Sequence, residues 1–233
     1  MTEGSTRKLV IAIDGPAGAG KSTIASRLAR QLGYVNLESG AMYRALALKA
    51  IEERLPVENG EAMLALAQRS RIELQPTGNG NIVLLDGRDV SARIRERDVT
   101  DAASRVSTHP KVREWMVDRQ REMGTQGGVI MEGRDIGTVV FPHADVKIFL
   151  DADSTIREQR RVVQANAVDD PERAAKLKAD MRARDQRDTT RAVAPLVAAA
   201  DAIHIDSTSL TIEEVIAEAE RIVAAKLTET VTK

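Results

Sequence analysis

The amino-acid sequence predicts an α/β fold, with a mainly parallel sheet covered by helices on both faces, a small antiparallel insertion and a short helical lid. Three observations carry this prediction. An apolar run, a glycine-rich loop and a helical pattern follow one another within residues 9–32. Strand and helix patterns alternate over most of the chain, whereas the stretch 60–105 contains short strands and tight turns. At 233 residues, the chain is long enough for one such domain with an insertion.

The first strand–loop–helix unit carries the strongest motif in the chain. Residues 9–14 form an apolar, β-branched run typical of a buried parallel strand, and residues 22–32 place apolar side chains at helical spacing. Between them, Gly-Pro-Ala-Gly-Ala-Gly-Lys-Ser matches the pattern G-x-x-x-x-G-K-[ST]. In this context the loop N–H groups face phosphates, Lys21 reaches the β- and γ-phosphates, and Ser22 offers its hydroxyl to Mg²⁺. The sequence therefore predicts a P-loop NTPase-type sheet, and a glycine-rich turn without a ligand is the alternative.

The next segments lead into the insertion. A short strand is expected over 34–37, and helices are expected over 41–54 and 61–69. Short strands follow at 72–75, 82–85 and 88–90; residues 76–81 join the first two, and Asp86-Gly87, a strong hairpin signal, joins the last two. We therefore expect residues 60–105 to form an inserted monophosphate-binding subdomain, with residues 1–59 and 106–233 as the core domain.

The second half returns to the α/β pattern. It predicts a helix over 110–123, strands over 128–131, 146–150 and 202–205, and helices over 155–164 and 171–188, with the lid near 157–190. Thr211 and Glu214 form a capping box that opens the last helix. Because ligands bind beyond the carboxyl ends of parallel strands, the P-loop, Ser39 and residues 132–135 should converge on one rim.

Two polar segments at this rim are candidates for ligand contact. Ser39 stands at a helix start with Arg44 about one turn later, an arrangement that can hold a second phosphate. The alternative is that Ser39 caps the helix and Arg44 is solvated. The segment Glu132-Gly133-Arg134-Asp135 follows a fully apolar strand, and a salt-bridged loop is its alternative.

The helix near residue 180 changes character along one face. Its apolar positions 174, 177 and 181 are continued at helical spacing by charged side chains, namely Arg184, Asp188 and Arg191, with Arg187 beside them. A charged continuation of a buried stripe needs partners, and planar guanidinium groups grip phosphate in bidentate fashion. We interpret this end of the helix as entering a cleft for anionic ligands, and a solvated helix end is the alternative.

Composition limits the class of protein. The net charge of −1 argues against a nucleic-acid polymer as partner, and aromatic residues at 2% are too few for a base-stacking platform. The absence of cysteine excludes disulfides and thiolate metal sites, and the three histidines lack metal-ligand spacing. No apolar run approaches the ~20 residues of a membrane helix, and residues 1–8 are polar. We expect a cytoplasmic monomer.

These residues resemble the bacterial cytidylate kinases, a family of P-loop nucleoside monophosphate kinases. The similar stretches run in order from about residue 9 to 225, and they read Ile-Asp-Gly-Pro-Ala-Gly-Ala-Gly-Lys-Ser, Ser-Gly-Ala-Met-Tyr-Arg, Glu-Gly-Arg-Asp-Ile-Gly-Thr-Val-Val-Phe-Pro, Lys-Ile-Phe-Leu-Asp-Ala and Arg-Ala-Val-Ala-Pro-Leu. The resemblance implies transfer of the γ-phosphoryl group of ATP to CMP or dCMP, with Mg²⁺. Glu38 stands where many relatives have Asp, and we assign it no role.

The resemblance also implies residue roles. ATP would be held by Gly15, Pro16, Ala17, Gly18, Ala19, Gly20, Lys21, Ser22 and Thr23, with Ser22 also at the metal. The acceptor phosphate would contact Ser39, Arg44 and Arg134; cytosine would contact Ser104, Arg113 and Asp135; and the ribose would contact Asp188 and Arg191. Lys21, Arg134, Arg184 and Arg187 would be the catalytic residues that neutralise the transferring group. The chemistry is consistent, since phosphoryl transfer to a phosphate oxygen needs alignment and charge more than a general base.

Three alternatives remain at this point. A P-loop kinase of another nucleoside monophosphate, or of a small metabolite such as shikimate, would share the P-loop but would not require the antiparallel insertion. A nucleotide-binding switch protein would need a guanine-reading Asn-Lys-x-Asp segment, which the sequence does not contain. A structural protein with a vestigial P-loop would have little use for Lys21 and Ser22 together.

Overall fold

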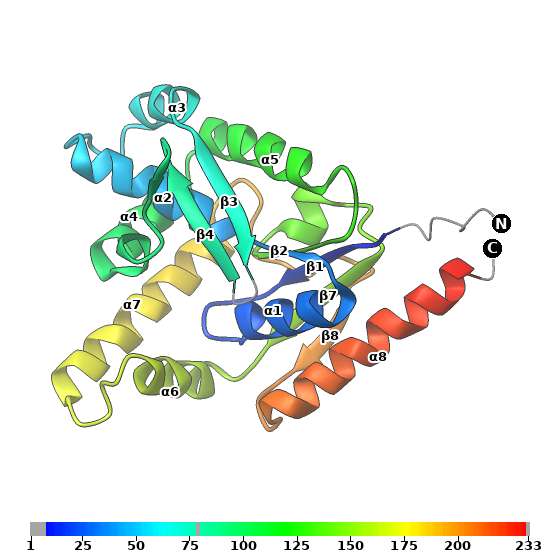
Figure 1. Cartoon of the computed structure of the whole chain (residues 1–233). Coiled ribbons are helices and arrows are strands. Elements are labelled where there is room, and N and C mark those ends of the chain that lie inside the picture. The colour runs from blue at the N-terminus through cyan, green and yellow to red at the C-terminus, as the bar shows by residue number, and fades with distance from the viewer. Residues whose placement is uncertain (1–7, 78–79, 232–233) are drawn as a thin grey trace.

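The computed structural model describes residues 8–77 and 80–231, so the polar N-terminal segment 1–7 lies outside the described residues. A five-stranded sheet in the order β2-β6-β1-β7-β8 forms the centre of the molecule (Figure 1). Every neighbouring pair is parallel. The strands are β1 (Val10–Asp14), β2 (Val35–Glu38), β6 (Val129–Gly133), β7 (Val146–Asp151) and β8 (Ile203–Asp206). The predicted parallel sheet is confirmed.

Helices cover both faces of this sheet. On one face, α1 (Lys21–Leu32) and α8 (Ile212–Val231) pack against alternate residues of β1, including Ile11 and Ile13. On the other face, Ala12 packs with α5 (Pro110–Gly124) and with η2 (Ile136–Val140), a short π-helical turn. Because successive strand residues point to opposite faces, a strand buried on both sides needs apolar residues at consecutive positions, as at residues 10–13 of β1.

A second, antiparallel sheet forms the smaller unit. It consists of β3 (Ile72–Thr77), β4 (Gly80–Leu85) and β5 (Arg88–Asp89), and residues 78 and 79 of the expected 76–81 connection lie outside the described residues. It shares a buried cluster with α2 (Ser39–Glu52), α3 (Gly60–Gln68) and α5. The antiparallel insertion is confirmed, whereas the limits 60 and 105 stay a prediction because helices outside them complete its core.

One helix was missed in the sequence. After the 3₁₀ turn η1 (Arg93–Arg95), α4 (Arg97–Val106) runs through a stretch for which only strands and turns were expected after residue 69. Its buried side chains are Val99, Ala102, Ala103, Ser104 and Val106. The apolar members recur at the i, i+3, i+4 and i+7 positions of an amphipathic helix, which is the signal that would have revealed it.

Two helices cover residues 157–190, where a lid was predicted: α6 (Ser154–Gln164) and α7 (Pro171–Thr190), which pack against each other. Helix α7 also contacts α4 of the smaller unit, as Figure 1 shows. At the start of α8 the capping box is confirmed: the Thr211 N–H donates to Glu214 at 2.8 Å, and the Glu214 N–H donates to the Thr211 hydroxyl at 3.2 Å. Within the described residues, no helix combines the length and apolarity that spanning a membrane requires.

Candidate active site

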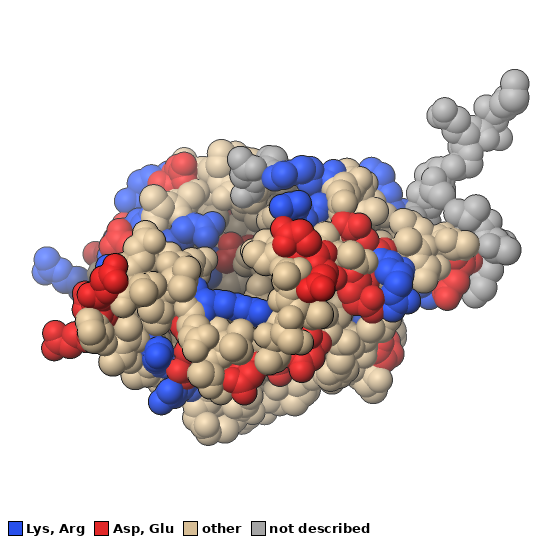
Figure 2. Space-filling view, turned by 90° about the horizontal axis from the view of Figure 1, so that it is seen from below, with Lys and Arg blue, Asp and Glu red and all other residues tan. Residues whose placement is uncertain are grey.

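The carboxyl ends of β1, β2 and β6 meet at a cavity of about 1170 Å³ between the sheet, α4 and α7. Figure 2 shows a hollow with basic side chains in it. Most of the predicted site residues line this one cavity: Ala17, Gly18, Lys21, Ser22, Ser39, Arg44, Ser104, Arg113, Arg134, Asp135, Arg184, Arg187, Asp188 and Arg191. The remaining predicted residues are Gly15, Pro16, Ala19, Gly20 and Thr23, which complete the P-loop and the first turn of α1.

Two P-loop positions require glycine. Gly15 has φ +147°, and a Cβ there would lie 1.9 Å from the Leu150 carbonyl oxygen of β7. Gly18 has φ +76°, and a Cβ there would lie 3.0 Å from Met181 Cε and 3.1 Å from the Arg157 carbonyl oxygen. Residues that carry a Cβ rarely adopt these φ values, and a Cβ would clash with these neighbours. Only glycine therefore allows the P-loop backbone to lie so close to them. The P-loop therefore lies between β7 on one side and helices α6 and α7 on the other.

Lys21 lies buried at the floor of the cavity. Its Nζ donates to the Pro16 carbonyl at 2.6 Å, which folds the side chain back along the loop. Burial, together with the positive charge of Arg134, lowers the pKa of Lys21 to about 7. A buried ammonium that is so weakly compensated favours an anionic ligand, because a phosphate would supply the missing counter-charge.

Glu132 is the penultimate residue of β6 and lies beside Ser22 at the end of the P-loop. The carboxylate is buried, and its Oε1 has no hydrogen-bond partner. Burial raises the pKa of Glu132 and the charge of Glu38 adds to this effect, whereas Lys21 and a hydrogen bond with Ser22 oppose it. A carboxylate and a hydroxyl that lie within hydrogen-bond distance of each other, as Glu132 and Ser22 do, are ligand types that Mg²⁺ accepts directly or through its water shell. In the sequence, Glu132 was distinguished only as part of a charged segment.

Asp14, which the sequence analysis did not select, connects the end of β1 to the segment that follows β6. Its Oδ1 accepts from the Ile136 N–H at 2.8 Å, and its Oδ2 accepts from the Gly137 N–H at 2.7 Å. Burial raises the pKa of Asp14 to about 6. These bonds fix the start of η2 directly after Arg134 and Asp135. A charged residue closing an apolar strand was the available signal.

Ser39 and Arg44, which were predicted to hold a second phosphate, lie in the first two turns of α2. Ser39 Oγ donates to the Glu132 carbonyl at 2.7 Å, so Ser39 joins α2 to β6 and does not cap its own helix. Arg44 pairs with Glu38 at 2.5 Å, and only 11% of its side chain is exposed. Burial acts to raise the pKa of Glu38, but Arg44 outweighs it and the pKa is lowered. The alternative of a helix cap with a solvated arginine is therefore wrong.

A buried charge cluster lies deeper in the cavity, where α4, α5 and α7 meet. Arg113 Nη2 donates to Asp135 Oδ2, and Arg191 Nη2 lies 3.7 Å from Asp135 Oδ1. Arg113 also donates to the Ser107 carbonyl at 3.1 Å. Close by, the Ser104 hydroxyl accepts from Arg187 Nε at 3.0 Å. The residues predicted to read a base are therefore brought together, with Asp135 shared between two guanidinium groups.

Asp188 organises the arginines of the charged stripe. Arg134 Nε donates to Asp188 Oδ2 at 2.8 Å, and Arg184 and Arg191 each lie 3.9 Å from its carboxylate. Burial acts to raise the pKa of Asp188, but Arg134 and Arg184 outweigh it and lower the pKa. The side chains of Asp188 and Arg191 are only 6% and 4% exposed. The alternative of a solvated helix end is wrong for these positions.

Unpaired polar atoms concentrate in this cavity. Among the described residues, the buried side-chain atoms without a hydrogen-bond partner include five from its lining: Arg44 Nε, Arg113 Nε, Glu132 Oε1, Arg184 Nε and Arg191 Nη2. Buried polar groups are normally paired, so such a group needs a specific explanation. Four cationic donors facing one cavity are suited to an anionic ligand with several acceptor oxygens.

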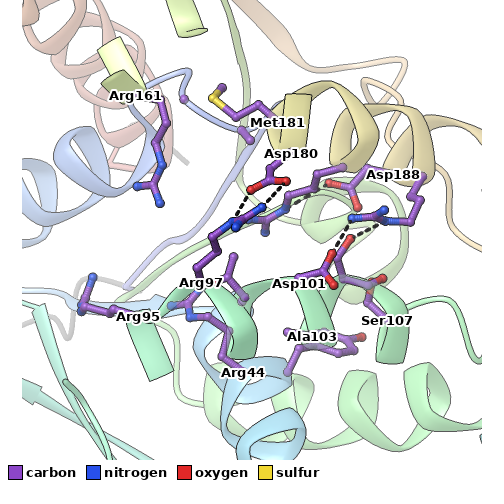
Figure 3. A pocket seen from close by; sticks show the side chains of 18 of the residues that line it. Arg44, Arg95, Arg97, Asp101, Ala103, Ser107, Arg161, Asp180, Met181 and Asp188 are labelled. Carbon is purple, nitrogen blue, oxygen red and sulfur yellow. Dashed lines mark hydrogen bonds and ion pairs between the residues drawn. The ribbon is translucent and has the colours of Figure 1, made fainter. Parts of the chain in front are cut away.

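The mouth of the cavity is crossed by ion pairs between α4 and α7 (Figure 3). Arg97 donates to Asp180 through Nε at 2.5 Å and through Nη2 at 2.8 Å, and Arg187 lies 3.4 Å from Asp101. Arg161 of α6 points toward the same space in Figure 3. The Arg97 and Asp180 side chains are half exposed, so their pairing contributes little to stability.

Comparisons with known proteins find related sequences over most of the chain. A family model described as cytidylate kinase matches residues 11–225. The cytidylate kinase of Anoxybacillus flavithermus is 50% identical over 210 residues, covering 90% of this chain and 93% of that protein. The cytidylate kinase of Enterococcus faecalis is 47% identical, covering 94% and 97%. A crystal structure of an uncharacterized Eubacterium ventriosum protein, 12% identical with a TM-score of 0.50, covers 94% of this chain and 99% of its own and supports the fold alone.

Proposed function

The chain belongs to the cytidylate kinase family, and from that membership we propose how its cavity works. The protein is an enzyme, a nucleoside monophosphate kinase that transfers the γ-phosphoryl group of ATP to CMP or dCMP. The products are ADP and CDP or dCDP. We propose that the P-loop holds ATP and that the cluster of Arg44, Arg113, Arg134 and Arg191 holds the acceptor nucleotide.

One observation carries this assignment. A P-loop with a buried lysine and a second group of cationic, unpaired donors face each other across a single cavity. A hydrolase would need only the first of these sites, whereas a kinase with a phosphorylated acceptor needs both. The shared cavity supports transfer between two bound phosphates, because holding both reactants in line supplies much of the rate enhancement.

The base would be read at the Arg113–Asp135 pair. Cytosine offers an N4 donor, which a carboxylate accepts, and its N3 and O2 acceptors suit the Arg113 guanidinium and the Ser104 hydroxyl. Uracil reverses the polarity at the first two positions. Asp188 and Arg191, buried beside this pair, would contact the ribose. The dual role of Asp135, which both orients Arg113 and accepts from the base, supports selection of cytosine.

Charge neutralisation would come from both sides of the transferring group. Lys21 and the P-loop N–H groups would hold the β- and γ-phosphates, while Arg134, Arg184 and Arg187 would approach from the acceptor side. No general base is needed, because the acceptor phosphate is already anionic at neutral pH. The Ser22 hydroxyl and the unpaired carboxylate oxygen of Glu132 would hold Mg²⁺, which would supply positive charge to neutralise the charge that develops during transfer. A cytoplasmic, monomeric enzyme is part of the same proposal.

The experiment is a coupled ADP-release assay with ATP and a panel of acceptors: CMP, dCMP, UMP, AMP and shikimate. We expect turnover with CMP and dCMP well above that with the other three. The matched control is Lys21→Met, which keeps the length of the side chain and removes its charge. Faster turnover with AMP or shikimate than with CMP would show that the proposed acceptor, CMP or dCMP, is wrong.

A further inference from the structure

Ala17 of the P-loop is hydrogen-bonded to both α6 and α7. Arg157 of α6 donates from Nη1 to the Ala17 carbonyl at 2.9 Å. The Ala17 N–H in turn donates to Asp185 Oδ1 of α7 at 3.3 Å. Arg157 and Asp185 form an ion pair with each other. Both main-chain polar groups of Ala17 are therefore used by one pair of opposite charges, which joins the P-loop, α6 and α7.

The Arg157–Asp185 ion pair is largely buried. Arg157 is buried, and its Nε also donates to the Ala152 carbonyl at 3.0 Å, which fixes the guanidinium from a second direction. Asp185 is 21% exposed. One turn earlier on α7, Met181 packs so closely on Gly18 that a Cβ there would lie 3.0 Å from its Cε. Helix α7 thus rests on the P-loop at residues 181 and 185.

Arg184 adjoins this anchor and has little to hold it. Its Nε is buried without a hydrogen-bond partner, and its ion pair with Asp188 is long, at 3.9 Å. The positive charge of Arg184 is one cause of the lowered pKa of Lys21, so the two cations lie near each other, in the space where the phosphates would bind. The position of Arg184 relative to the P-loop therefore depends on how α7 is attached there, and Asp185, the next residue, provides the hydrogen bond and the ion pair of that attachment.

We propose that Arg157 and Asp185 are a positioning pair that attaches α7 to the P-loop and thereby places Arg184 for phosphoryl transfer. The pair does not touch a substrate. Because it holds α7 against the P-loop, the pair fixes the distance between the P-loop and Arg184, the arginine that would contact the transferring phosphoryl group. This inference rests on the proposed function for its kinetic part, whereas the attachment itself is independent of it.

A matched control is present on the same two helices. Arg182 of α7 donates to Glu158 of α6 through Nε at 2.6 Å and Nη2 at 2.9 Å, and 71% of its side chain is exposed. This pair also joins α6 to α7 but has no hydrogen bond to the P-loop among the described residues. A general loosening of the two helices would follow from loss of either pair, whereas misplacement of Arg184 should follow from loss of Asp185 alone.

The kinetic test is a double-mutant cycle. Asp185→Ala should lower kcat by ~10- to 100-fold with little change in KM for CMP, because it removes a partly buried, charge-assisted contact. In the Arg184→Ala background the same substitution should cost less than ~3-fold, since the residue it positions is gone. Asp185→Asn, which still accepts from the Ala17 N–H, should recover part of kcat. Arg182→Ala should stay within about twofold of the parent.

A second measurement does not depend on the reaction. Hydrogen exchange of a P-loop peptide spanning 12–20 should become faster in Asp185→Ala and stay unchanged in Arg182→Ala, whereas loosening of α7 itself would follow from either substitution. Additive losses in the cycle, or unchanged exchange in Asp185→Ala, would overturn the positioning role. If the parent enzyme does not phosphorylate CMP, the proposed function falls, and the exchange result still decides whether the pair anchors α7.

Discussion

Replacing Lys21 by Met should stabilise the nucleotide-free protein while removing its activity. The difference between the ordinary lysine pKa of 10.5 and about 7 corresponds to roughly 5 kcal/mol against the buried ammonium, at 1.36 kcal/mol per pKa unit. Methionine removes this cost. It also leaves the Pro16 carbonyl without its donor, at ~1–3 kcal/mol, and takes a cation away from Glu132. A net gain of roughly 2 kcal/mol near neutral pH is expected.

The sign of the pH dependence makes this prediction specific. Because the folded pKa of Lys21 is lowered, the destabilisation is fully present below pH 7 and is relieved as pH rises from 7 toward 10.5. The advantage of the Met variant should therefore be largest near pH 6.5, and the stability difference should shift by about 2.5 kcal/mol toward the parent by pH 9, where the Met variant is no longer the more stable protein. Urea unfolding of both proteins at these pH values measures it. A Met variant less stable than the parent at pH 6.5, or a pH-independent difference, would refute the reasoning.

Three further predictions concern the acceptor side and the mouth. Arg184→Ala should lower kcat and kcat/KM together by roughly 10²-fold, whereas Arg191→Ala should chiefly raise KM for CMP; equal effects on KM in steady-state kinetics would contradict the separation. Asp135→Asn should reduce a CMP-over-UMP preference in kcat/KM of at least ~10² toward parity, and an unchanged ratio would remove it from base reading. Exchanging the charges of Arg97 and Asp180 should leave kcat/KM within ~5-fold, because an exposed pair contributes little; a larger loss would make the pair essential.

The sequence was sufficient for the features that depend on local pattern. The strand before the P-loop, the parallel sheet, the Asp86-Gly87 hairpin and the Thr211 cap follow from periodicity and turn chemistry, which act over a few residues. The P-loop, Ser39, Arg134 and Asp135 were brought together because strand ends converge on one rim of a parallel sheet. The other candidate site residues reach the cavity from helices α2, α4, α5 and α7 or from the residue after α7. Their individual roles come from the family resemblance and remain predictions.

The remaining features depend on distant partners. Asp14 bonds to the N–H groups of residues 136 and 137, and Asp185 bonds to Ala17, so neither contact has a local signature. Ser39 was interpreted as a helix cap in one alternative, but the carbonyl of Glu132 on a neighbouring strand takes its hydroxyl. Helix α4 is different, since Val99, Ala102, Ala103 and Val106 gave a helical pattern that the surrounding turn signals obscured.

The most direct test of the account is to follow the phosphoryl group itself. With ATP, CMP and Mg²⁺, ³¹P NMR should show CMP and ATP disappearing together while CDP and ADP form in equal amounts. Release of inorganic phosphate in place of CDP would show that the P-loop hydrolyses ATP without transfer. That result would contradict the central claim, which is that the P-loop with Lys21 and the arginine cluster with Arg134 bind two phosphorylated substrates in one cavity.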